Sequence, residues 1–172
     1  MAAVDRQPTP KTRKNSPQPQ TLRGRALRLL GRREFSRQEL EKRLRGYVDP
    51  DNPAELETLL DDLAERGWLS DARYADAVVR KRTGQFARRS IAQELKRAGV
   101  DEAVTAAALA EVDPDQEFVA ALALCRRKFR RTPVDQKEKA RQIRFLQSRG
   151  YSLSLALRVL KHAGAQDKDS GV

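Results

Sequence analysis

The sequence of 172 residues has few of the side chains from which enzyme sites are built. It contains one cysteine, Cys125, and one histidine, His162. A single cysteine excludes an internal disulfide and a cysteine-rich zinc site, and a Ser-His-Asp, Cys-His or histidine-rich metal site would depend on His162 alone. A glycine-rich phosphate loop of the Walker type is also missing. We therefore expect no enzyme activity, no metal site and no cofactor.

Long apolar runs and aromatic residues are scarce too. No run approaches the roughly 20 apolar residues that a bilayer-spanning helix needs. Aromatic residues make up 5% of the chain, whereas charged residues make up 34%. A large β-sandwich or a deep cofactor pocket normally uses more aromatic and β-branched side chains. The composition favours a soluble protein of small amphipathic helices.

The two ends of the chain differ in composition from the rest. Four of the eight prolines lie within the first 21 residues, among polar and basic side chains. Such a segment cannot bury enough apolar surface to offset the entropy lost on ordering. We predict a disordered, proline-rich basic arm over residues 1–21 and a disordered polar tail over residues 164–172.

Helix-start signals and apolar residues at helical spacing fill the stretch between these ends. Ser36, Asn52 and Asp135 each precede such a stretch and are typical N-cap residues. No sustained alternation of apolar and polar residues indicates a strand. These signals predict nine helices, over residues 22–33, 36–45, 53–66, 71–83, 88–98, 102–111, 114–130, 136–149 and 153–163.

One helix-ending pattern occurs three times: a leucine, three residues, a glycine and a large apolar residue, at residues 63–68, 95–100 and 146–151. In a Schellman ending the glycine adopts the left-handed conformation, and the next residue packs back on the leucine. We therefore expect core packing, rather than the stacking of nucleotide bases, for Trp68 and Tyr151, and for Tyr47, which also follows a glycine.

The predicted helices group in threes, with a period of about 45 to 50 residues. Each group is too small to be very stable without its neighbours. The sequence predicts an all-α fold of three tandem three-helix repeats that form an elongated, curved chain of modules. We place these modules at residues 22–68, 69–112 and 113–163.

The remaining chemistry is cationic. The formal net charge is +11, and arginine outnumbers lysine 25 to 10. Arginine holds phosphate or carboxylate groups with two hydrogen bonds, so it is favoured where the geometry of an anionic partner matters. Solvated helix ends would also account for any one cluster, since cations are favourable there. Arginine clusters recur near the end of the first helix in all three modules, which favours a continuous basic surface for a polyanion.

The candidate contact residues come from these clusters. The first cluster also contains Arg23, Arg25 and Arg28. We expect charge reversal at Arg88 and Arg89 to weaken binding of the polyanion without unfolding the protein. The candidates are Arg32, Arg33, Arg80, Lys81, Arg82, Arg88, Arg89, Arg126, Arg127, Lys128, Arg130 and Arg131.

Several segments together resemble the RecX family of recombination regulators, across nearly all of residues 22–163. The most specific is Gly-Trp-Leu-Ser-Asp-Ala-Arg-Tyr-Ala, at residues 67–75. The others are Ala-Leu-Arg-Leu-Leu at 26–30, Ser-Arg-Gln-Glu-Leu at 36–40, Arg-Ser-Ile-Ala-Gln-Glu-Leu at 89–95, Arg-Lys-Phe at 127–129 and Arg-Phe-Leu-Gln-Ser-Arg-Gly-Tyr at 144–151.

The resemblance implies a cytoplasmic bacterial protein that acts in DNA repair and homologous recombination. Members of this family bind in the groove of the RecA filament on single-stranded DNA. They down-regulate its ATPase, strand exchange and SOS-type coprotease activity. The implied partners are this filament and, in addition, bare DNA, with no membrane partner, and the implied state is a monomer. Inhibition would follow either from bridging neighbouring filament subunits or from blocking access of the duplex.

Two other functions fit the residues alone. Three-helix modules look like helix-turn-helix domains, so the chain could be a sequence-indifferent DNA-binding protein that acts independently of RecA. Such a protein would bind DNA tightly by itself, with a steep salt dependence. A helical adaptor for an unrelated acidic protein would bind neither DNA nor RecA.

Overall fold

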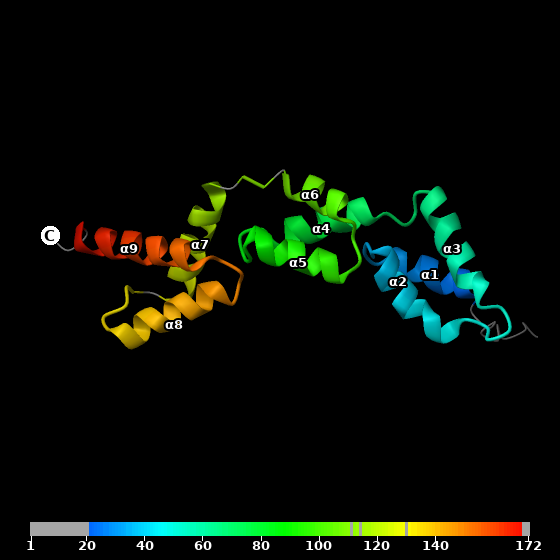
Figure 1. Cartoon of the computed structure of the whole chain (residues 1–172), viewed down its shortest axis with the longest axis horizontal. Helices are drawn as coiled ribbons and strands as arrows, with labels where there is room; N and C mark the ends of the chain where they lie inside the picture. Colours follow the sequence, from blue (N-terminus) through cyan, green and yellow to red (C-terminus); the bar gives the residue numbers. More distant parts are fainter. Residues whose placement is uncertain (1–20, 111, 114, 130, 170–172) are drawn as a thin grey trace, which may run out of the picture.

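The computed structural model describes residues 21–110, 112–113, 115–129 and 131–169 (Figure 1). These residues form nine α-helices and one 3-10 helix, and none of them lies in a strand, so the all-α prediction is confirmed. The α-helices are α1 (Leu22–Leu30), α2 (Arg37–Leu44), α3 (Ala54–Glu65), α4 (Asp71–Arg82), α5 (Arg88–Arg97), α6 (Glu102–Ala110), α7 (Asp115–Lys128), α8 (Gln136–Gln147) and α9 (Leu153–Asp169), and the 3-10 helix η1 (Arg45–Tyr47) follows α2.

The helices form three successive groups, which we call module 1 (α1–α3), module 2 (α4–α6) and module 3 (α7–α9). The three groups lie in a row along the longest axis of the molecule (Figure 1). Each has its own hydrophobic core, in which Leu40 and Leu60, Leu95, and Leu146 are fully or almost fully buried. The prediction of three tandem three-helix repeats is confirmed. Because each core is small, contacts between neighbouring modules must supply part of the stability.

Most of the predicted helix starts carry the expected side-chain caps. The Ser36 hydroxyl accepts a hydrogen bond from the Glu39 amide (3.1 Å), and the Asp135 carboxylate accepts one from the Glu138 amide (2.7 Å). The cap predicted at Asn52 is wrong, because the N-cap of α3 is Pro53 and no side chain caps it. A tight turn precedes α3, and the backbone carbonyl of Asn52 accepts a hydrogen bond there in place of its side chain.

The three predicted Schellman endings are confirmed. Gly67, Gly99 and Gly150 have positive φ angles of 69°, 78° and 88°. In each ending the amide after the glycine donates to the carbonyl of the leucine four residues before the glycine, over 2.9 to 3.2 Å. After Gly67 the packing differs from the prediction: Leu69 is buried at 4% exposure, whereas Trp68 is 44% exposed.

The ends of the chain differ from the predicted boundaries. The predicted disordered arm over residues 1–21 includes Thr21, but the Thr21 hydroxyl caps α1 by accepting a hydrogen bond from the Gly24 amide. Helix α9 continues to Asp169, beyond the predicted end at residue 163. One glycine costs a helix only about 1 kcal/mol relative to alanine, and no proline follows to stop it. Residues 1–20 and 170–172 lie outside the described part of the chain. Within that part, no helix is long and apolar enough to cross a bilayer.

The joints between modules repeat the same arrangement. At the first joint, Ser36 at the start of α2 donates its hydroxyl to the carbonyl of Ala98 at the end of α5 (2.6 Å). At the second joint, the amide of Ala87 at the start of α5 donates to the carbonyl of Arg149 after α8 (2.9 Å). In both cases 51 residues separate the equivalent positions. The second helix of modules 1 and 2 therefore begins against the glycine ending of the next module.

Two further contacts connect the same two helix starts to the next module. The amide of Arg37, the first residue of α2, donates to Asp71 on the first helix of module 2 (2.8 Å). The amide of Arg88, the first residue of α5, donates to Glu117 on the first helix of module 3 (2.7 Å). Each carboxylate thus satisfies a helix-start amide that has no partner within its own helix.

Candidate functional site

The predicted basic clusters divide into side chains that hold the fold together and side chains that face solvent. Arg82 belongs to the first kind. Its guanidinium donates three hydrogen bonds to the Glu94 carboxylate, over 2.8 to 3.1 Å, and this pair connects α4 to α5. The bond to Glu94 raises the pKa of Arg82 above its usual value. Arg82 is therefore engaged within module 2, and the assignment of Arg82 as a contact residue has no support in the geometry.

Arg88 also has an internal partner. Its guanidinium donates to the carbonyl of Val112 (2.8 Å), in the connection between modules 2 and 3, while its amide donates to Glu117. Arg88 is half-buried at this joint, whereas the neighbouring Arg89 is exposed. We correct the expectation that charge reversal at both positions leaves the fold intact. A carboxylate at position 88 would face the Val112 carbonyl and the Glu117 carboxylate.

Arg33 is the third candidate with an internal partner. Its guanidinium forms an ion pair with Glu39 at 3.0 Å and lies 3.7 Å from the centre of the Phe35 ring. Phe35 is buried, so the cation covers part of the module 1 core. Arg33 remains partly exposed, but its charge is compensated by Glu39.

The other candidates are exposed to solvent. In module 2 they are Arg80 and Lys81 at the end of α4, and Arg89 at the start of α5. Arg89 also lines a shallow hollow of about 360 Å³ on α5 and α6, with Lys96, Val100 and Thr105 among its neighbours. The exposed candidates elsewhere are Arg32 in module 1 and Arg126, Arg127, Lys128 and Arg131 in module 3, while Arg130 lies outside the described residues.

Part of the module 3 cluster surrounds an open hollow of about 530 Å³. Lys128 and Arg131 line it together with Arg141 and Phe129. The Arg141 guanidinium lies 5.7 Å from the centre of the Phe129 ring. The buried Gln142 amide donates to the Arg131 carbonyl (3.3 Å), which fixes the loop between α7 and α8. The structure therefore brings the end of α7 and the first half of α8 together around a hollow lined by three cations and one carboxylate, Glu138.

The sequence pattern did not predict that two aromatic residues are exposed. Tyr47 is 57% exposed and Trp68 is 44% exposed, so the prediction of core packing is wrong for both, whereas it is confirmed for Tyr151, which is 3% exposed. Trp68 lies near the guanidinium groups of Arg23 (5.7 Å) and Arg66 (5.6 Å), and its place in the core is taken by Leu69. Two adjacent apolar residues follow Gly67, and the helix-ending pattern alone does not decide which one turns inward.

The solitary cysteine is held in an unreactive state. Cys125 is buried, and burial raises the pKa of its thiol. A raised thiol pKa disfavours the thiolate, which is the nucleophilic form. Among the residues that the structure describes, no three His, Cys, Asp or Glu side chains come together to hold a metal ion.

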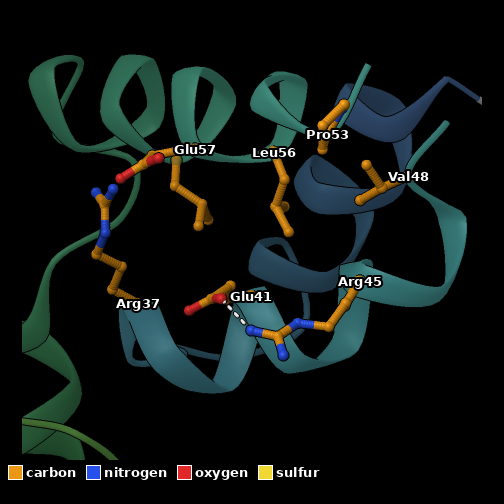
Figure 2. Close-up of a pocket in the computed structure, with 8 residues that line it drawn as sticks. Arg37, Glu41, Arg45, Val48, Pro53, Leu56 and Glu57 are labelled. Carbon is orange, nitrogen blue, oxygen red and sulfur yellow. Dashed lines mark hydrogen bonds and ion pairs between the residues drawn. The ribbon is translucent and has the colours of Figure 1, made fainter. Parts of the chain in front are cut away.

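The hollow between α2 and α3 has a different character from the basic faces. It has a volume of about 390 Å³ and is lined by apolar side chains and by charges of both signs. Figure 2 shows the ion pair between Arg45 and Glu41 on one side, and Arg37 extending toward Glu57 on the other. Arg37 also pairs with Asp61 (2.6 Å). The charges here are balanced internally, so this hollow does not attract a polyanion strongly.

The comparisons with known proteins agree on one family. Family profiles for the second and third three-helix domains of RecX match residues 70–109 and 115–160. The chain is 40% identical over 149 residues to a protein called regulatory protein RecX from Chromobacterium violaceum, covering 87% of this chain and 93% of that one. It is 42% identical over 148 residues to the protein of that name from Leptothrix cholodnii, covering 83% and 89%.

Solved structures show the same fold at lower sequence identity. RecX from Lactobacillus salivarius superposes with a TM-score of 0.66 at 16% identity, over 84% of this chain and 95% of that one. A second crystal structure of a regulatory protein RecX gives a TM-score of 0.66 at 23% identity, over 80% of this chain and 70% of that one.

Proposed function

Because the chain belongs to the RecX family of regulatory proteins, we propose that it binds the RecA filament on single-stranded DNA and mainly inhibits it. It acts in the bacterial cytoplasm as a monomer, in DNA repair and homologous recombination. Binding in the filament groove lowers the ATPase, strand-exchange and SOS-type coprotease activities of RecA. No covalent chemistry is needed for this role, only a difference in affinity between filament states.

The observation that carries the proposal is the recurrence of solvent-facing cations along the row of modules. Arg80, Lys81 and Arg89 provide them in module 2, and Arg127 and Lys128 provide them in module 3. Complementary charge directs such a surface to an acidic protein groove or to DNA within it. The internal partners of Arg82 and Arg88 remove these two residues from the proposed contact surface.

An elongated row of modules suits a helical groove. Docking of one module raises the effective concentration of the next, so several weak contacts combine into tight binding. This arrangement supports two routes to inhibition. The protein either bridges neighbouring filament subunits in a state that hydrolyses ATP poorly, or blocks access of the duplex to the filament.

The contact surface is tested with a paired substitution in module 2. Arg80→Ala with Arg89→Ala removes two exposed cations, and Arg158→Ala with Lys161→Ala on α9 removes the same charge elsewhere. We expect the first pair to raise the concentration needed for half-inhibition of the RecA ATPase by roughly tenfold, and the control pair to change it little. Equal effects of the two pairs would reject this surface.

The alternative is a sequence-indifferent DNA-binding protein that acts independently of RecA. The observation in its favour is the same set of exposed arginines on small helical modules. It predicts tight binding to bare DNA, with an affinity that falls steeply as salt rises, and no effect on the RecA ATPase.

A further inference from the structure

Module 1 carries a basic hollow in which Arg32, one of the predicted contact residues, lies beside residues outside that prediction. It lies between α1 and the end of α2 and has a volume of about 240 Å³. Its lining contains four arginines, one tyrosine and two leucines, and no carboxylate. These residues are Arg25, Arg28, Leu29, Arg32, Arg43, Leu44 and Tyr47.

The helices explain why these arginines converge. Positions 25, 28 and 32 are three and four residues apart, so they share one face of α1 and its C-terminal turn. Arg43 comes from the last turn of α2, and Tyr47 follows in η1. Leu44 is fully buried and anchors this end of α2 in the module 1 core. The cations therefore lie next to the packed core of module 1.

The acidic side chains of module 1 form their ion pairs elsewhere. Among the described residues, no ion pair involves Arg25, Arg32 or Arg43. The pairs around them are Arg23 with Asp62, Arg33 with Glu39, Arg37 with Asp61, Arg45 with Glu41, Arg66 with Asp62 and Arg73 with Glu34. The charges of Arg32 and Arg43 are thus left for an external anion.

Tyr47 adds an aromatic surface beside these cations. The Arg25 guanidinium lies 4.0 Å from the centre of the Tyr47 ring and covers one of its faces. The residue is nevertheless 57% exposed. A ring held by a cation on one side and open on the other is suited to stacking with a flat ligand group.

We propose that this hollow binds single-stranded nucleic acid, with backbone phosphates at Arg32 and Arg43 and one base stacked on Tyr47. Arginine clusters bind phosphates, and exposed aromatic rings bind the faces of unpaired bases. In a duplex the faces of the bases are covered by stacking, and an acidic peptide has no base to stack on the Tyr47 ring. The inference rests on the proposed function for its biological setting. In that setting, module 1 contacts the single DNA strand of the RecA filament.

The hollow of Figure 2, between α2 and α3, provides a matched control. Arg37 and Arg45 there are paired with Asp61 and Glu41. The variants Arg32→Ala/Arg43→Ala and Arg37→Ala/Arg45→Ala change the net charge equally within the same module. Circular dichroism melting curves check that both remain folded.

The experiment measures binding of the full chain, without RecA, to a labelled oligothymidine at low salt by fluorescence anisotropy. We expect Arg32→Ala/Arg43→Ala to weaken binding roughly tenfold, and to reduce the slope of log affinity against log salt by about 1.4, because two phosphate contacts are lost. The control pair should retain most of the affinity. Equal losses in both pairs, or equal binding of a duplex, would overturn the proposal.

Tyr47→Leu separates stacking from charge. We expect it to weaken oligothymidine binding roughly tenfold with an unchanged salt slope, and Tyr47→Phe to retain the affinity. An unchanged affinity in Tyr47→Leu would overturn the assignment of a stacked base.

Measurement of RecA ATPase inhibition on the same proteins distinguishes this inference from the proposed function. If the wild type inhibits RecA but does not bind the oligonucleotide, the inference fails and the proposed function stands. If the wild type binds the oligonucleotide through Arg32, Arg43 and Tyr47 but does not inhibit RecA, the inference stands and the proposed function fails.

Discussion

The two joints between modules share one backbone geometry but use different side chains to hold it. At the first joint a serine hydroxyl and the carboxylate of Asp71 hold the start of α2. At the second joint the start of α5 is Ala87, which has no capping side chain, and its amide binds the neighbouring module directly. Both joints share the close approach of a glycine ending and a helix-start amide that donates to a carboxylate of the next module. These two contacts define the repeat, and the other polar side chains differ between the joints.

This comparison explains why Ala87 is acceptable at a helix start. An alanine N-cap usually costs about 1 kcal/mol relative to serine. Here the adjacent helix-start amide of Arg88 donates to Glu117 of module 3. In contrast, α8 begins with its own cap, Asp135. A cap supplied by the next module couples the folding of α5 to that of module 3.

The largest expected effect is at the glycines of the joints. A Cβ atom at Gly99 would lie 2.8 Å from the Cβ of Gln38, and one at Gly150 would lie 2.7 Å from the Cβ of Ser90. Gly67 has the same left-handed conformation but no atom within 4 Å of an added Cβ. We expect Gly99→Ala and Gly150→Ala each to lower the free energy of unfolding by about 2 to 4 kcal/mol, and Gly67→Ala by about 1 to 2 kcal/mol.

Urea denaturation followed by circular dichroism measures these differences. If all three substitutions lower the free energy of unfolding equally, the joints are not closely packed at Gly99 and Gly150, and this packing does not contribute to stability.

An intermediate effect is expected at Arg88, which is specific to the second joint. Arg88→Ala removes the charged donor to the Val112 carbonyl and should lower the free energy of unfolding by about 1 to 2 kcal/mol. The neighbouring Arg89 is exposed, so Arg89→Ala should change the free energy of unfolding by less than about 0.5 kcal/mol. Thermal melting compares the stability of the two variants. The same stability for both would contradict the role of Arg88 at the second joint.

The smallest effect is expected at the first joint, where the Tyr74 hydroxyl donates to Glu39 of module 1 (3.0 Å). Burial, together with the bond to Glu39, raises the pKa of Tyr74 from 10.0 to about 12. The folded state thus favours the protonated phenol, so this contribution to stability is full below pH 10 and is lost as the pH rises from about 10 to about 12. Tyr74→Phe should cost about 0.5 to 1.5 kcal/mol at neutral pH.

The difference in unfolding free energy between wild type and Tyr74→Phe should shrink above pH 10. Other titrating groups are common to both proteins, so their effects cancel in this difference. A difference that stays constant up to pH 12 would contradict the assigned cause of the pKa shift.

Local features of the fold were predictable from the sequence, and long-range ones were not. The Ser36 and Asp135 caps and the glycine endings depend on residues within one turn, so their patterns identified them. The partner of Arg82 is Glu94, on the next helix, and the partners of Arg88 are Val112, in the connection after α6, and Glu117, on the next module. No spacing rule connects such positions, so both arginines looked like free surface cations.

The candidate interface was predictable only in outline. The arginine clusters indicated a polyanion partner, but they did not separate Arg89 from Arg88, which differ in burial and in partners. The basic hollow of module 1 was missed because Arg43 and Tyr47 lie outside the clusters. Only the packing of α1 against α2 brings them to Arg28 and Arg32.

The central claim, that this protein regulates RecA by binding its filament, is tested most directly by an ATPase titration. RecA from the same source hydrolyses ATP on single-stranded DNA at fixed salt while the protein is added, and binding to the bare DNA is measured in parallel. We predict inhibition at ratios well below one protein per RecA monomer, with weak binding to bare DNA. An unchanged ATPase together with tight binding to bare DNA would contradict the claim.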